Sequence, residues 1–181
     1  MERATHSVNQ LLILARLDPQ AALPAEPVDL YELLQDVIAE AGALASERQL
    51  RVQVDVRPGE VVRGDWNALA ILLRNLVVNA FCYTPEGGAV AIALDAGILR
   101  FSNDSHPIAE PARLTDRFYR SVEVRGPETV PGTGLGLAIA LRICELHGFE
   151  LSVSYREDEA RFHAVVDFRR CIEGSAAHTR D

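Results

Sequence analysis

Three glycines at alternate positions, Gly132, Gly134 and Gly136, lead directly into an apolar run with helical spacing that starts at Leu137. Glycine tolerates a positive φ and allows a ligand or another backbone to come close. Where such a run opens a helix, free N–H groups and the helix dipole favour a bound anion. The run therefore predicts either a phosphate-binding loop or a flexible turn before a core helix, and other parts of the chain have to decide between the two.

The composition excludes several classes of function. The net charge is −8, which argues against a nucleic-acid-binding surface because such a surface is basic. All 18 basic residues are arginine, so the chain lacks the lysine that a P-loop NTPase or a protein kinase needs. The three cysteines are far apart in the sequence, which is typical of a reducing compartment. No run of about 18 apolar residues predicts a membrane span.

Hydrophobic periodicity gives the order of helices and strands. We expect helices over 1–18, 30–46, 65–82 and 134–147, and strands over 50–56, 60–63, 89–95, 98–102, 150–155 and 160–168. Runs of strands separated by helices indicate an α+β fold, a two-layer sandwich with a mixed, mainly antiparallel sheet and helices on one face. The glycine run follows a loop rather than a strand, which argues against a dinucleotide-binding fold.

The chain divides into four expected segments. These are a helical piece over 1–18, a proline-marked linker over 19–26, a main domain over 27–168, and a polar, disordered tail over 169–181. Either Val28-Asp29-Leu30 forms a short strand or Asp29 caps the helix that follows. The stretch from Asn103 to Pro131 has no lasting periodicity, and a loop of this length in a compact domain is usually a lid or a binding loop.

Three polar residues on the predicted helix 65–82 are spaced four apart. Asn75, Asn79 and Tyr83 therefore share one face of that helix. Such a face is either a solvated helix surface or part of a polar site.

These motifs, in this order, resemble the ATP-binding catalytic domain of bacterial sensor histidine kinases, which has the Bergerat fold shared with gyrase and Hsp90-type ATPases. The resemblance covers residues 27–168. Residues 75–88 look like the N box, 101–108 stand at the first glycine box, 114–121 are similar to the F box, and 132–137 to the second glycine box. Residues 1–18 resemble the end of the second helix of a dimerisation and phosphoacceptor domain. Any one box is a weak signal, but the ordered set is specific.

The resemblance implies ATP and Mg²⁺ as ligands and assigns no catalytic residue within the chain. The implied nucleotide-binding residues are Asn75, Asn79, Tyr83, Asn103, Arg120, Gly132, Thr133, Gly134, Leu135 and Gly136. Asn79 would give a carboxamide oxygen to Mg²⁺, and Tyr83 would pack beside the nucleotide. The glycine box would hold phosphates, and Arg120 or Arg125 would reach them from the lid.

Asn103 stands where the family pattern has an aspartate that accepts a hydrogen bond from the adenine amino group. An asparagine at this position also occurs in a subgroup that resembles metal-responsive kinases. Its side-chain oxygen still accepts, although loss of the charge should weaken adenine recognition by about 1 kcal/mol. Ser105 and Pro107 replace two glycines of the pattern, and a backbone that needed φ > 0 would be strained at both.

These departures leave two interpretations open. The first is a protein-histidine kinase domain of two-component signal transduction, which donates the γ-phosphate of ATP to a histidine for phosphorelay to a response-regulator aspartate. The second is a Bergerat-fold pseudokinase that acts as a protein-interaction module with weak or no ATP binding. A gyrase-like ATPase is disfavoured because residues 74–78 contain no Asp or Glu to serve as a general base.

The resemblance also implies partners and a location. His6 lacks the phosphoacceptor pattern, so we expect the phosphorylated histidine on a dimerisation domain outside this chain, and no autophosphorylation by the chain alone. The intact kinase would be a homodimer anchored in the inner membrane. This domain would then be cytoplasmic.

Overall fold

The computed structural model describes residues 25–116, 119 and 134–171. The predicted helix over 1–18, most of the linker and the segment 120–133 lie outside the described residues. The elements in chain order are β1 (Glu26–Asp29), α2 (Leu30–Glu47), β2 (Arg51–Val56), β3 (Val61–Gly64), α3 (Trp66–Tyr83), β4 (Ala89–Asp95), β5 (Ile98–Asp104), η1 (Pro111–Arg113), α4 (Gly136–His147), β6 (Glu150–Arg156), β7 (Arg161–Asp167) and η2 (Arg169–Cys171).

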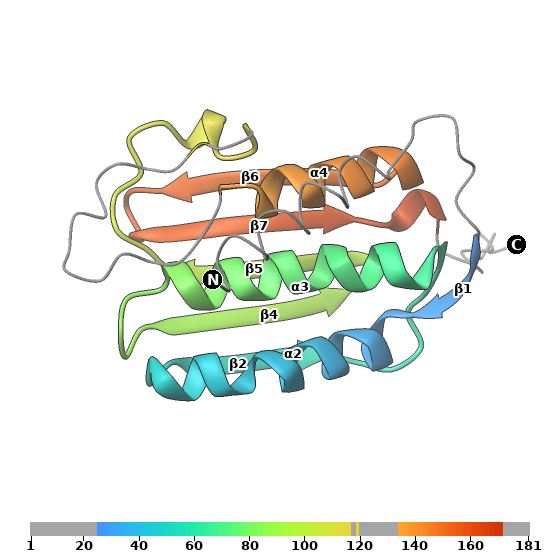
Figure 1. Cartoon of the computed structure of the whole chain (residues 1–181), viewed down its shortest axis with the longest axis horizontal. Helices are drawn as coiled ribbons and strands as arrows, with labels where there is room; N and C mark the ends of the chain where they lie inside the picture. The colour runs from blue at the N-terminus through green and yellow to red at the C-terminus, as the bar shows by residue number, and fades with distance from the viewer. Residues whose placement is uncertain (1–24, 117–118, 120–133, 172–181) are drawn as a thin grey trace, which may run out of the picture.

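The domain has two layers, a five-stranded sheet and three helices that cover one of its faces (Figure 1). The strand order is β2-β4-β5-β7-β6, and β1 pairs with β3 in a separate two-stranded sheet. Among the described strand pairs, β2 and β4 are parallel and the others are antiparallel. The predicted α+β sandwich with a mixed, mainly antiparallel sheet is confirmed.

Helix α3 lies between α2 and α4 and supplies the centre of the core (Figure 1). Asp65 caps its start, since the carboxylate accepts a hydrogen bond from the Ala68 N–H at 2.8 Å. Leu69, Leu72 and Leu73 are fully buried on the side that faces the sheet and the flanking helices. By length and composition α3 could cross a membrane, but half of it is buried within the domain, as in the core helix of a globular protein.

Asp29 fulfils both roles that the sequence left open. It is the last residue of β1, and its carboxylate also accepts a hydrogen bond from the Tyr31 N–H at 2.8 Å at the start of α2. The first turn of α2 is thereby held against the small β1–β3 sheet.

Strict alternation gives the five-stranded sheet one apolar face. On the helix-facing side, Val90 of β4 is level with Asn103 of β5 and Phe162 of β7, and all three are buried. The other side of this row carries Ala89, Asp104 and Arg161. Asn103 is therefore a polar residue at the end of an otherwise apolar stripe.

Several predicted boundaries move by a residue or two, each for a local reason. Helix α4 begins at Gly136 rather than 134, because Gly134 has φ +70°, outside the helical region. It ends at His147, and Gly148 follows in the left-handed conformation that glycine adopts readily at a helix end.

Strand β2 is only partly buried, with Val54 38% exposed, because it is an edge strand.

The first three residues of the predicted tail, 169–171, are helical. Phe168 is fully buried, and the Cys171 N–H donates to its carbonyl at 2.8 Å, so residues 169–171 form the short helix η2. The rest of the predicted tail lies outside the described residues.

Truncating the centre of α3 should lower the free energy of unfolding. Leu72→Ala removes a fully buried side chain and is expected to cost about 2–5 kcal/mol, measured by urea denaturation. Val78→Ala on the same helix is the matched control, because Val78 is 37% exposed and its truncation should change stability by less than about 1 kcal/mol. Equal losses in the two variants would show that α3 does not pack as described.

Candidate functional site

The face of α3 that carries Asn75, Asn79 and Tyr83 is half-exposed, while the neighbouring leucines are buried. The Asn75 amide donates to the Ile71 carbonyl at 2.8 Å, which leaves its Oδ1 free to face outward from the helix. The side chain of Asn79 makes no hydrogen bond to any other residue that the structure describes. The two carboxamides are thus available along one side of the helix.

The start of α4 lies against this face. A Cβ added to Gly136 would come within 3.1 Å of the Asn75 Oδ1, so glycine allows the close approach of the two helices. The Leu135 side chain makes no capping hydrogen bond to the first turn of α4, where the N–H groups have no intrahelical partners. The fold therefore brings the described part of the second glycine box, at Gly136, to Asn75 of the N box.

Asn103 lies on the helix-facing side of the sheet, one residue before the end of β5, and is 1% exposed. Its Nδ2 donates to the Asp104 carbonyl at 3.0 Å, but its Oδ1 is buried and has no hydrogen-bond partner among the described residues. A buried acceptor left unpaired costs about 1–3 kcal/mol. This acceptor is therefore suited to a donor that the described part of the chain does not supply.

The condition for strain at the first glycine box, a positive φ at Ser105 or Pro107, is not met. The described non-glycine residues with positive φ are Gln49, Ala96 and Ala160. Neither Ser105 nor Pro107 is among them, and the Ser105 N–H donates to the Ala160 carbonyl at 3.0 Å. The chain leaves β5 along a path that does not need glycine.

For the remaining predicted nucleotide-binding residues, the structure gives either the burial alone or no description. Tyr83 is half-buried one turn after Asn79, and its packing beside a nucleotide stays a prediction. Leu135 is 1% exposed directly before α4. Arg120, Gly132 and Thr133 lie outside the described residues.

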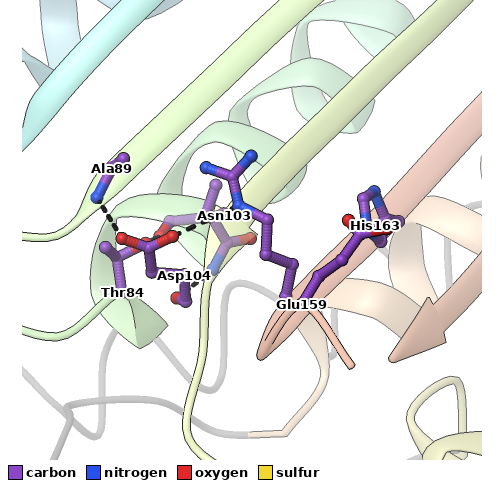
Figure 2. Close-up of polar contacts among 8 residues, drawn as sticks. Thr84, Ala89, Asn103, Asp104, Glu159 and His163 are labelled. Carbon is purple, nitrogen blue, oxygen red and sulfur yellow. Dashed lines mark hydrogen bonds and ion pairs between the residues drawn. The ribbon is translucent and has the colours of Figure 1, made fainter. Parts of the chain in front are cut away.

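Sequence reasoning missed two charged residues, Asp104 and Arg161, at the end of the sheet where Asn103 lies. The Asp104 carboxylate accepts from the Ala89 N–H at 2.8 Å and from Arg161 Nε at 3.2 Å. Figure 2 shows Asp104 between Ala89 and Asn103. The one available signal was the adjacent polar pair Asn103-Asp104 at a strand end, since neighbouring strand residues point to opposite faces.

Arg48, at the end of α2, was also missed. Its guanidinium donates to the Thr84 carbonyl at 2.8 Å, and its own carbonyl accepts from the Gly87 N–H at 3.0 Å. These bonds hold the turn that follows α3 against the start of β2. No sequence pattern reports such a long-range contact.

The buried thiols are not suited to nucleophilic chemistry. Burial raises the pKa of Cys82, with the nearby Arg48 acting in the opposite direction. Burial also raises the pKa of Cys144 to about 12. Both thiols stay protonated at neutral pH and behave as packing residues.

Residues 64–170 match the sequence family described as histidine kinase-, DNA gyrase B- and HSP90-like ATPases. The sensor protein QseC of Salmonella typhimurium is 36% identical over 173 residues, which cover 93% of this chain and 37% of QseC. The chain thus spans little more than a third of that relative.

Solved structures of histidine kinases also resemble this chain. The cytoplasmic segment of histidine kinase QseC is 28% identical with a TM-score of 0.61, covering 92% of this chain and 93% of that one. Full-length ShkA, solved in complex with AMPPNP, is 28% identical with a TM-score of 0.70, covering 94% of this chain and 36% of that one. The chain therefore belongs to the histidine kinase-, DNA gyrase B- and HSP90-like ATPase family, and the relatives that it matches there are sensor histidine kinases.

Proposed function

We propose that this domain binds Mg²⁺-ATP and donates the γ-phosphate to a histidine on a dimerisation domain outside the chain. The observation that carries the proposal is the buried, unpaired Oδ1 of Asn103. The exocyclic amino group of adenine is a donor that would satisfy this oxygen. A neutral acceptor makes a weaker bond than a carboxylate, so we expect moderate rather than tight affinity.

The phosphates would lie at the start of α4. Backbone N–H groups at a helix N-terminus favour an anion, and here they adjoin Asn75 through Gly136. Since the chain contains no lysine, side-chain charge for the phosphates would come from arginine, with Arg120 as the candidate.

Asn79 is the candidate protein ligand for Mg²⁺. Among the residues that the structure describes, no three His, Cys, Asp or Glu side chains gather into a metal site. Mg²⁺ usually takes one or two protein oxygens and completes its shell with phosphates and water, and the free carboxamide of Asn79 fits that role. When bound, the ion would neutralise phosphate charge during transfer.

The partners follow from the relatives and are part of the proposal. A dimerisation domain would present the histidine, a response regulator would receive the phosphoryl group, and the intact protein would be a homodimeric sensor in the inner membrane with this domain in the cytoplasm. Binding of AMPPNP by ShkA supports a working nucleotide site. The pseudokinase interpretation loses its main support, because the altered first glycine box is not strained.

Removing the Asn79 carboxamide should weaken binding of Mg²⁺-ATP. Calorimetric titration of the whole chain is expected to give a micromolar to low-millimolar Kd, raised about tenfold by Asn79→Ala, which corresponds to about 1.4 kcal/mol. Without Mg²⁺ the two proteins should bind ATP alike. Asn67→Ala, an exposed asparagine in the first turn of α3, is the control and should change nothing.

The same titration can refute the proposal. Absence of binding at millimolar ATP, from a chain whose circular dichroism shows it folded, would support the pseudokinase. An equal loss from Asn67→Ala would show that the effect of Asn79→Ala is not local.

Gly136→Ala should reduce ATP affinity by displacing Asn75. The added Cβ would lie 3.1 Å from Asn75 Oδ1, closer than ordinary contact, so α4 or the carboxamide has to shift. We expect a threefold to tenfold rise in Kd, roughly 1 kcal/mol. Gly42→Ala in α2 is the control, because its Cβ would meet nothing within 4 Å; it should leave affinity unchanged and slightly raise thermal stability. A Gly136→Ala chain that binds ATP normally would place the nucleotide elsewhere.

The chain alone should not become phosphorylated on histidine. Incubation with radiolabelled ATP is expected to give no acid-labile phosphate, because the positioned histidine is supplied by another domain. Addition of a dimerisation domain with its phosphoacceptor histidine should produce labelling on that domain. Labelling of the isolated chain would contradict this division of roles.

A further inference from the structure

We propose that Asp104 is a positioning residue for base recognition: it orients the Asn103 carboxamide so that an oxygen, and not an NH₂ group, faces the base. The inference rests on the proposed nucleotide site and adds to it a source of selectivity between 6-amino and 6-oxo purines. Arg161 and the start of β4 hold Asp104 in place.

A carboxamide is ambiguous at this position. A carboxylate can only accept hydrogen bonds, whereas an asparagine presents an acceptor or two donors depending on a half-turn of its amide plane. A 6-amino purine donates at its 6-position, and a 6-oxo purine accepts there. Asn103 by itself would therefore bind either base, and selectivity requires something that fixes the amide plane.

The Asp104 backbone carbonyl fixes that plane. It accepts from Asn103 Nδ2 at 3.0 Å, which leaves Oδ1 as the buried atom without a partner. The reversed amide would place Oδ1 against the Asp104 carbonyl oxygen, so that two acceptors face each other and the Nδ2 hydrogen bond is lost. The described geometry therefore favours an acceptor toward the base.

The Asp104 side chain anchors this carbonyl from the opposite face of the sheet. Its Oδ2 accepts from the Ala89 N–H at 2.8 Å, and its Oδ1 accepts from Arg161 Nε at 3.2 Å. Ala89 opens β4 and Arg161 opens β7, the two strands on either side of β5 (Figure 1). Asp104 is thus tied to both neighbours at the strand end where Asn103 lies (Figure 2).

Close packing restricts the turn between α3 and β4, which contains Gly88. A Cβ on Gly88 would come within 2.6 Å of Thr84 Cγ2 and 2.8 Å of the Pro85 carbonyl, and 3.5 Å from Asp104 Oδ2. The Ala89 N–H is therefore presented to Asp104 from a turn that packs tightly against the end of α3. The carboxylate of Asp104 acts through Asn103, because it points to the face of the sheet opposite the site.

Binding of ATP and of inosine triphosphate, both with Mg²⁺, tests the inference by calorimetry. Inosine triphosphate has an oxygen in place of the 6-amino group, so we expect it to bind the unaltered chain about fivefold to tenfold more weakly than ATP. Asp104→Ala should raise the Kd for ATP until the two nucleotides differ by less than twofold. Asn103→Ala should likewise reduce the ratio of the two dissociation constants to less than twofold. The double variant Asn103→Ala, Asp104→Ala should not reduce this ratio any further.

Asp167→Ala is the matched control. Asp167 is also a carboxylate at a strand end, and it is bound by an arginine, Arg169, at the opposite end of the sheet. Removal of the Asp167 carboxylate should leave the ratio of the Kd for inosine triphosphate to the Kd for ATP unchanged. If circular dichroism shows that Asp104→Ala is unfolded, Arg161→Gln replaces it in the test. This variant removes the Arg161 hydrogen bond to Asp104 and keeps the hydrogen bond from the Ala89 N–H. It should lower the ratio of the Kd for inosine triphosphate to the Kd for ATP at least twofold.

The outcomes separate the two proposals. If the unaltered chain binds neither nucleotide, the proposed function fails. If it binds ATP and Asp104→Ala weakens both nucleotides by the same factor, Asp104 is only structural and the inference is overturned. An unaltered chain that binds both nucleotides equally would also overturn it, because no selectivity would then exist.

Discussion

Burial of the apolar face of α3 is the constraint on which the rest of the domain depends. This face packs on the sheet, and α2 and α4 close its two sides. Once it is fixed, helical geometry determines what the remaining surface presents. Asn75 and Asn79 are thereby held at a constant orientation along one half-exposed side, by the same packing that stabilises the fold.

The candidate site combines three elements that are distant in the sequence. The second half of α3 gives the carboxamides, the end of β5 gives Asn103, and the start of α4 gives backbone N–H groups. Side-chain charge contributes little among these residues, and recognition relies on neutral acceptors and backbone donors. Such groups work only when they are held in place, since each hydrogen bond is weak by itself.

Much of this could be predicted from periodicity and turn chemistry. The helices over 30–46 and 65–82 and the strands over 89–95 and 98–102 were predicted from local patterns, because each depends on neighbours in sequence. The contacts of Arg48 with Thr84 and of Arg161 with Asp104 were not readable. They join residues far apart in the chain, and an arginine on a strand or at a helix end is compatible with many surroundings.

The sequence by itself determined which residues would lie on one face of a helix, that phosphate binding could not use lysine, and that the order of motifs resembled an ATP-binding domain. Only the tertiary structure decided that Ser105 and Pro107 are unstrained, because backbone angles depend on the path that the fold imposes. It also decided that Asn103 keeps an unpaired oxygen. The side chain alone could accept or donate, and the position of the Asp104 carbonyl, fixed by contacts between strands, selects one of the two.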